Sequence, residues 1–281
     1  MISDSALVAG ALISLLVLGQ GASTLRPDPP IACTACADWN VAREPSRVFG
    51  NTYYVGVKGL SAVLITSPDG LILLDAALPQ SAAVIDENIR KVGFRTADVR
   101  LILNSHAHFD HAGGIAALQR ASGAVVASSP SGARALEQGG PTADDPQFAL
   151  DGKFPAVAKV RAVKDREVLR VGPLAVTAHF TPGHTPGATT WSWRSCEGSS
   201  CKDIVYADSL NAVSAPGFRF TGDQKQPGTV AEFRRSIARV AALPCDVLLT
   251  VHPAFAEGQT CRTYAAGAAR RLDDRVAQER K

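Results

Sequence analysis

The chain has little excess charge of either sign and no extended basic segment. Its 281 residues include 29 Lys and Arg against 26 Asp and Glu, which gives a net charge of +3. Basic side chains are scattered, apart from a mixed-sign stretch at 270–275 that is typical of a solvated helix face. Proteins that bind nucleic acid gather basic residues into a patch or stripe. The composition therefore predicts no nucleic acid partner.

Long hydrophobic runs are also missing, with one exception at the N-terminus. The apolar run Leu7–Leu18 would span about 18 Å as a helix, which is short of the roughly 30 Å core of a bilayer. Small residues follow it, so the pattern predicts an export signal at 1–22, although Asp4 and the lack of a preceding Lys or Arg depart from the usual signal. A core helix is the alternative. We therefore expect an N-terminal tail at 23–46, one catalytic domain at 47–281, and a monomer in the periplasm without a membrane anchor.

Cysteines are few but even in number, and an even count in an exported protein suggests disulfides. Pairing by proximity gives Cys196–Cys201, Cys245–Cys261 and, with less support, Cys33–Cys36. Other connectivities remain open. The Cys33–Cys36 spacing also fits a redox or zinc motif, but it lacks a second pair and a βαβ context.

The hydrophobic patterns indicate a single large α/β domain rather than several small ones. Strand-like patterns fill much of 47–75 and 168–207, and helical spacing appears at 80–92, 229–243 and 263–279. A run of strands followed by helices occurs twice. This order predicts two similar halves, each a sheet with helices on its outer face.

Four candidate zinc ligands lie within six residues, directly after a predicted strand that ends at Leu103. His106 and His108 are two residues apart, so an extended backbone points both side chains the same way. Asp110 and His111 lie where the chain turns into a helix, and adjacent residues diverge there. This arrangement can supply ligands to two metal ions.

Two further histidines follow predicted strands. His184 lies in a turn rich in proline and glycine, and His252 follows an apolar strand and precedes Pro253. Binding sites collect at such strand ends in layered α/β folds, whereas His179 lies within a strand and is interpreted as structural. Nitrogen and carboxylate ligands suit zinc, and two three-ligand sites leave positions open for catalysis. Zinc-bound hydroxide, present at neutral pH, would then attack an amide carbonyl, with Asp110 as the catalytic residue.

The His106-x-His108-x-Asp110-His111 motif is identified as the signature of the metallo-β-lactamase superfamily. Five other segments resemble the third subclass of metallo-β-lactamases: 50–56, 73–75, 181–187, 206–210 and 251–253. The resemblance implies a four-layer αββα sandwich and two Zn²⁺ ions, the first on His106, His108 and His184 and the second on Asp110, His111 and His252. It implies that Asp75 orients a ligand, and that the protein hydrolyses penicillins, cephalosporins and carbapenems and confers antibiotic resistance.

The resemblance also implies substrate contacts. Ser209 would stand in place of a cysteine ligand and hold the substrate carboxylate. A small hydroxyl residue is usual two positions later, but this chain has Asn211, which can still donate a hydrogen bond. The irregular stretch 137–159 would flank the groove, with Phe148 and Phe154 either as apolar walls or as buried anchors.

Two other functions compete with β-lactam hydrolysis. A lactonase or a glyoxalase II-like thioesterase of the same superfamily commonly uses an aspartate that bridges the two metals, and Asp208 has the position to be mistaken for it. A non-enzymatic periplasmic zinc-binding protein would need four protein ligands for each ion.

Overall fold

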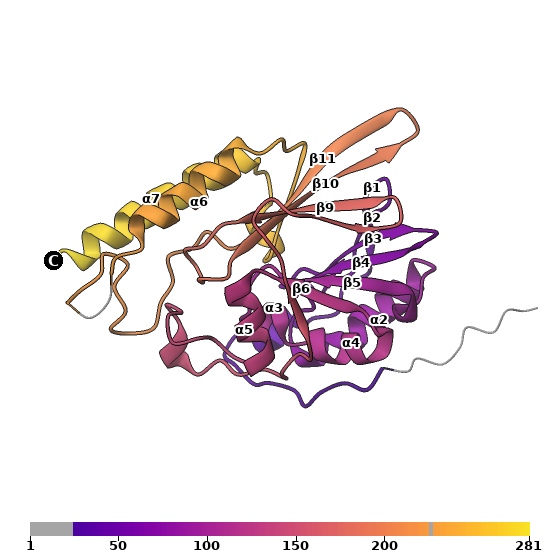
Figure 1. Cartoon of the computed structure of the whole chain (residues 1–281), viewed down its shortest axis with the longest axis horizontal. Coiled ribbons are helices and arrows are strands. Elements are labelled where there is room, and N and C mark those ends of the chain that lie inside the picture. The colour runs from indigo at the N-terminus through magenta and orange to yellow at the C-terminus, as the bar shows by residue number, and fades with distance from the viewer. Residues whose placement is uncertain (1–24, 225–226) are drawn as a thin grey trace, which may run out of the picture.

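The computed structural model describes residues 25–224 and 227–281, so the predicted signal at 1–22 lies outside the described residues. Two β-sheets pack face to face, with helices on the outer side of each (Figure 1). The seven strands of the first sheet follow one another in chain order: β1 (Ser46–Phe49), β2 (Thr52–Tyr54), β3 (Val63–Ser67), β4 (Gly70–Leu74), β5 (Val99–Leu103), β6 (Val125–Ser128) and β7 (Val160–Ala162).

The second sheet has five strands in the order β12-β11-β10-β9-β8. Its strands are β8 (Val168–Val171), β9 (Leu174–Phe180), β10 (Thr189–Glu197), β11 (Ser200–Ala207) and β12 (Val247–Thr250). Strands β8 to β11 pair antiparallel and β12 joins β11 in parallel, so β9, β11 and β12 all run in one direction. Their carboxyl ends therefore share one edge.

The helices form the two outer layers. The first sheet is covered by α2 (Ala82–Lys91), α4 (Ile115–Ser122) and α5 (Pro130–Gln138), and the second by α6 (Val230–Ala242) and α7 (Cys261–Glu279). Two helices of four residues complete the set: α1 (Cys36–Trp39) and α3 (Phe109–Ala112). No helix within 25–224 or 227–281 is long and apolar enough to cross a membrane.

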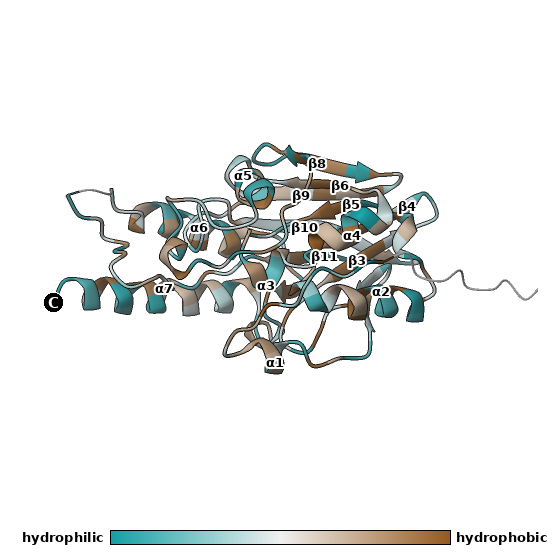
Figure 2. Cartoon of the chain, turned by 90° about the horizontal axis from the view of Figure 1, so that it is seen from below, coloured by the Kyte–Doolittle hydropathy of each residue, from teal (hydrophilic) through white to brown (hydrophobic). Residues whose placement is uncertain are grey.

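The four layers follow from the alternation of side chains along each strand. In β4, Leu71 and Leu73 pack beneath the helices, whereas Ile72 and Leu74 pack between the sheets. In β11, Ile204 and Tyr206 face the first sheet, and Val205 and Ala207 face α6 and α7. Figure 2 shows the apolar colour concentrated in the strands and polar stretches along α7. The predicted αββα sandwich is thus confirmed.

The predicted helix after the ligand motif is broken in two. It ends at Ala112 in α3 and resumes at Ile115 in α4. Gly113 and Gly114 lie between them because the chain passes very close to its neighbours: a Cβ at Gly113 would lie 2.4 Å from Pro79 Cδ, and one at Gly114 would lie 2.4 Å from the Ala76 carbonyl oxygen. Helix α5 and strand β7 were not predicted: α5 opens with Pro130-Ser131-Gly132, residues that usually mark a turn, and β7 has only three residues.

The six cysteines form the three pairs Cys33–Cys36, Cys196–Cys201 and Cys245–Cys261. The first pair joins Cys33 to the first residue of α1, and the tail is tied to the domain because Ile31 exchanges two hydrogen bonds with the Gln80 side chain. The third pair joins the N-terminus of α7 to the segment that leads into β12.

Removing the Cys245–Cys261 bond is expected to destabilise the protein most. It closes a loop of sequence separation 16, against 5 for Cys196–Cys201. The loss of loop-closure entropy predicts a cost of about 3 kcal/mol for a Cys245→Ala/Cys261→Ala variant and about 2 kcal/mol for the Cys196→Ala/Cys201→Ala control. Urea denaturation of the oxidised proteins measures both free energies of unfolding. A larger loss in the control would contradict the ranking.

Candidate metal centre

The candidate ligands meet where the strands of both sheets end. His106 and His108 follow β5, His184 follows β9, and His252 follows β12. The ligand atoms of His106, His108 and His184 all lie within 4.8 Å of one another, and all three side chains are buried. Because an imidazole ring offers one lone pair to a metal, three converging rings make a three-ligand site with an open position.

A second group adjoins the first. The ligand atoms of His106, Asp110 and His111 also lie within 4.8 Å of one another. His252 extends this group, since its Nε2 lies 3.5 Å from the Asp110 carboxylate and its ring centre lies 4.9 Å from that of His111. The structure therefore brings all six predicted ligands into one cluster. Trp39 from the tail closes one side of the cluster, with its ring centre 5.3 Å from that of His252.

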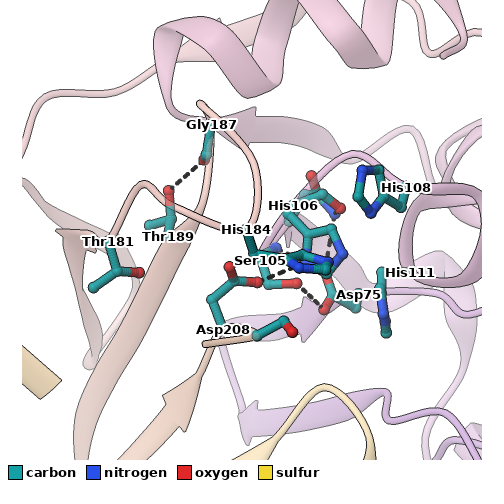
Figure 3. A network of polar contacts seen from close by, with 12 residues as sticks. Asp75, Ser105, His106, His108, His111, Thr181, His184, Gly187, Thr189 and Asp208 are labelled. Carbon is teal, nitrogen blue, oxygen red and sulfur yellow. Dashed lines mark hydrogen bonds and ion pairs between the residues drawn. The ribbon is translucent and has the colours of Figure 1, made fainter. Parts of the chain in front are cut away.

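Two of the imidazoles are held by buried carboxylates. Nδ1 of His106 lies 2.6 Å from Asp208 Oδ1 (Figure 3), and Nε2 of His108 lies 3.2 Å from both oxygens of Asp145. A carboxylate on one ring nitrogen fixes the tautomer and orientation and makes the other nitrogen a better ligand. Sequence reasoning did not assign either role: Asp208 was weighed only as a bridging ligand, and Asp145 lies in a loop without periodicity.

Backbone carbonyls hold two other rings in the same way. Nδ1 of His184 lies 2.9 Å from the Asn211 carbonyl oxygen, and Nδ1 of His252 lies 3.2 Å from that of Gly59. In both rings the carbonyl accepts a hydrogen bond from the Nδ1–H group, which leaves Nε2 as the nitrogen with the lone pair. The partners come from loops distant in sequence, so the ring orientations depend on the complete fold.

The donor set fits a metal such as zinc. With Nδ1 of His106 donating to Asp208, its Nε2 is a bare lone pair that is buried and has no partner among the described residues. A buried nitrogen without a partner is costly in a protein interior, and nitrogen and carboxylate ligands are those zinc prefers. A role as metal ligand explains why Nε2 of His106 has no hydrogen-bond partner, and the site is therefore a metal-binding site.

The charge states also suit ligation. Burial lowers the pKa of His184 to about 3 and that of His252 to about 4, so both rings are neutral at pH 7. Burial alone would raise the pKa of Asp110, but the imidazoles of His111 and His252 hold it well below its usual range. Neutral imidazoles and an ionised carboxylate are the forms that bind a metal.

Asp75 organises the centre through hydrogen bonds to residues next to the ligands and in β11, and not through a bond to an imidazole. Its carboxylate accepts hydrogen bonds from the Ser105 amide and hydroxyl, the Asn104 side chain and the Tyr206 hydroxyl (Figure 3). Burial raises the pKa of Asp75 to about 6. Asp75 therefore acts through the backbone: its bonds fix the segment that carries His106.

A cavity of about 350 Å³ opens onto the cluster. Its lining includes the predicted ligands His108, Asp110, His184 and His252, and two of the four predicted substrate residues, Ser209 and Asn211. Gln147 and the apolar side chains of Trp39, Leu150, Val213 and Phe255 also line it. Neither predicted phenylalanine is a wall of this cavity. Phe154 is a buried anchor, the second of the two alternatives, because its ring lies in the core cluster of the first half, and Phe148 is exposed and lies outside the lining.

Gln147 is a cavity residue that sequence reasoning missed. Its Nε2 lies 3.5 Å from His108 Nδ1 and 3.4 Å from His184 Nε2, so the amide covers the space between these two rings. Asp145 fixes this part of the loop, because its carboxylate also accepts a hydrogen bond from the backbone N–H of Gln147. An uncharged residue in an irregular loop gives no signal in a single sequence.

Comparisons with known proteins agree with this geometry. The family model described as "Metallo-beta-lactamase superfamily" matches residues 55–198. The solved structure titled "Rm3 metallo-beta-lactamase" is 49% identical, with 89% of this chain and all of that chain covered and a TM-score of 0.86. A subclass B3 metallo-β-lactamase from a soil metagenome library, MEM-A1, is also 49% identical, with 86% and 98% covered and a TM-score of 0.83.

A curated relative with another name matches more weakly. The hydroxyacylglutathione hydrolase of Anaeromyxobacter dehalogenans is 33% identical over 204 residues, which is 72% of this chain but only 60% of that protein. The family match, the αββα fold and the cluster of buried histidines and aspartate lead to one conclusion: the chain belongs to the metallo-β-lactamase superfamily and is a metal-binding hydrolase.

Proposed function

We propose that the protein is a zinc-dependent β-lactamase that opens the amide ring of penicillins, cephalosporins and carbapenems and so confers antibiotic resistance. The observation that carries the proposal is the shared cavity, in which Ser209 and Asn211 lie with His108, His184, His252 and Asp110. A bicyclic β-lactam has an amide carbonyl and a nearby carboxylate, so it needs both kinds of group in one groove. The 49% identity to two solved metallo-β-lactamases over most of the chain supports this substrate class.

We propose two zinc ions, one held by His106, His108 and His184 and the other by Asp110, His111 and His252. Zinc ions held there supply Lewis acidity, which makes water nucleophilic at neutral pH and polarises an amide carbonyl. The side chains around the cavity bind and orient the substrate and the attacking water.

The protein groups around the cavity have separate tasks. Asp110, ionised and buried, accepts a hydrogen bond from the attacking water and aims it at the substrate carbonyl. Trp39, Leu150 and Phe255 form apolar walls that exclude bulk water from the amide. Ser209 donates to the substrate carboxylate and fixes the ring over the histidines.

Asp208 disfavours the thioesterase alternative. A bridging aspartate shares carboxylate oxygens with both metals, whereas Asp208 Oδ1 is bound to Nδ1 of His106, on the outer side of that ring, and only Oδ2 has no described partner. The two nitrogens of an imidazole point apart, so a carboxylate on Nδ1 lies away from the ion on Nε2. Asp208 therefore fits a positioning role better than a bridging one.

We further propose that the protein acts as a monomer in the periplasm. Three disulfides support an oxidising compartment, since structural disulfides are rare in the bacterial cytosol.

A substrate panel tests the proposed activity. We expect the zinc-loaded protein to hydrolyse a carbapenem or a cephalosporin with kcat/KM at least about a hundredfold above that for an acyl-homoserine lactone or S-lactoylglutathione, because these lack the fused ring with its adjacent carboxylate. Ultraviolet absorbance follows loss of the β-lactam ring. Turnover of the lactone or thioester, with none of any β-lactam, would reverse the assignment.

Loss of one ligand tests the metal centre. His184→Ala is expected to remove one bound zinc and lower kcat/KM by about a thousandfold or more, since the other two histidines cannot hold the ion alone. His179→Ala is the matched control, because His179 binds Ser192 within the second sheet, away from the cavity. Metal analysis of both purified variants gives the zinc content. Equal zinc content in the His184 variant and the wild type would exclude this ligand.

The role of Asp145 has its own test. Asp145→Ala frees the outer nitrogen of His108 and is expected to weaken zinc binding by about ten- to a hundredfold. Competition with a fluorescent chelator measures the affinity, and Asp144→Ala, at the exposed neighbouring position, is the control. Unchanged affinity in the Asp145 variant would show that the loop does not hold His108.

A further inference from the structure

One face of α7 holds the segment 208–218, which forms part of the cavity wall. Tyr264, Arg271 and Arg275 are separated by seven and four residues, so their side chains lie on the same side of the helix. Each of the three makes hydrogen bonds to this segment. The helix is itself fixed by the Cys245–Cys261 bond and by its buried apolar residues, so it can act as a rigid support.

Two of the three contacts set the path of the backbone. The Tyr264 hydroxyl donates to the Asp208 carbonyl at 3.0 Å and accepts from the Leu210 amide at 3.1 Å. Arg275 donates to Ser214 Oγ at 2.7 Å and to a backbone carbonyl further along the segment. These bonds hold the chain on both sides of residue 211.

The third contact reaches a side chain instead. Nε of Arg271 donates to Oδ1 of Asn211 at 2.9 Å. A guanidinium has only donors, so it accepts nothing from the amide NH₂ group and favours the oxygen. The contact therefore decides which way the Asn211 amide is turned, with its oxygen toward α7 and its nitrogen toward Ser209, whose Oγ lies 3.5 Å away.

This orientation gives the cavity wall two donors. The Asn211 nitrogen carries two hydrogens, of which one is directed at Ser209 Oγ and the other remains available. Ser209, as the acceptor of that contact, keeps its own hydroxyl proton to donate. Asn211 and Ser209 both line the cavity, whereas Arg271 does not, so the arginine acts on the cavity only through Asn211.

We infer that Arg271 is a positioning residue that turns the Asn211 amide nitrogen toward the cavity and so makes Ser209 and Asn211 a donor pair for the carboxylate of the substrate. The inference deepens the proposed function and rests on it. Without Arg271 the amide is free to turn over, and its carbonyl oxygen would then face the carboxylate and repel it. Arg271 should therefore affect binding of the anionic substrate more than the chemical step.

The test compares an acid with its ester. Arg271→Met keeps an unbranched chain as far as the position of Nε but removes the guanidinium donors. For a cephalosporin with a free ring carboxylate we expect KM to rise about three- to tenfold while kcat stays within about twofold, because the lost hydrogen bond serves a charged group in the bound state. For the methyl ester of the same cephalosporin we expect no change in KM. Arg271→Lys, which restores a donor, should recover most of the affinity.

Two controls separate this effect from a general loss of structure. Arg270→Met alters the exposed neighbour on the same helix and should change neither KM nor Tm. In an Asn211→Ala background Arg271→Met should have no further effect on KM, because the two residues act as one unit. Equal rises in KM for acid and ester, no rise for either, or full additivity in the double variant would each overturn the inference.

A binding measurement keeps this test separate from the β-lactamase proposal. If the wild-type zinc-loaded protein hydrolyses no β-lactam, the proposed function fails, and phenylacetate then serves as the anionic probe with phenylacetamide as its neutral match. We expect Arg271→Met to weaken the binding of phenylacetate several-fold and to leave the binding of phenylacetamide unchanged. Titrations followed by the side-chain amide resonance of Asn211 measure both affinities. Equal affinity of wild type and variant for phenylacetate would reject the role of Arg271.

Discussion

The contact between the Asp208 carboxylate and Nδ1 of His106 is the interaction on which the site depends. Both groups are fully buried, and the pair joins the end of β11 in one sheet to the end of β5 in the other. Burial lowers the pKa of His106 well below its usual value and raises that of Asp208 to about 6, so burial disfavours the charged form of both groups. The hydrogen bond offsets part of this cost, and it leaves Nε2 of His106 directed at the other ligands.

The same constraint explains why the site needs both sheets. Each sheet alone ends in loops that carry only some of the ligands: β5 leads to His106, and β9 and β12 lead to His184 and His252. Packing of the inner faces brings these ends to one edge, and burial there lowers the pKa of His184 and His252, so that these two imidazoles are neutral at pH 7. The burial of alternate strand residues therefore both stabilises the sandwich and brings the imidazoles together in a buried site.

Sequence reasoning predicted the parts of the molecule that have a local physical signature. The repeated order of strands followed by helices predicted the layers, and the spacing of His106 and His108 predicted that both point the same way. It did not assign Asp145, Gln147 or Arg271, because their roles depend on contacts 37 to 60 residues distant along the chain. For Phe154 the sequence left a cavity wall and a buried anchor open, and only the packing shows that its ring turns into the core.

Helix α7 links stability to recognition in a way that neither the fold nor the ligand motif reveals alone. Its buried face packs on the second sheet, and its flank holds the segment after β11 through Tyr264 and Arg271. That segment begins with Asp208, which orients His106, and continues to Asn211, whose carbonyl orients His184 and whose side chain lies in the cavity. A shift of the helix would thus move the partners of His106 and His184 and the Asn211 side chain together. The ligand motif supplies three of the imidazoles, whereas the orientation of the Asn211 side chain depends on a contact from α7.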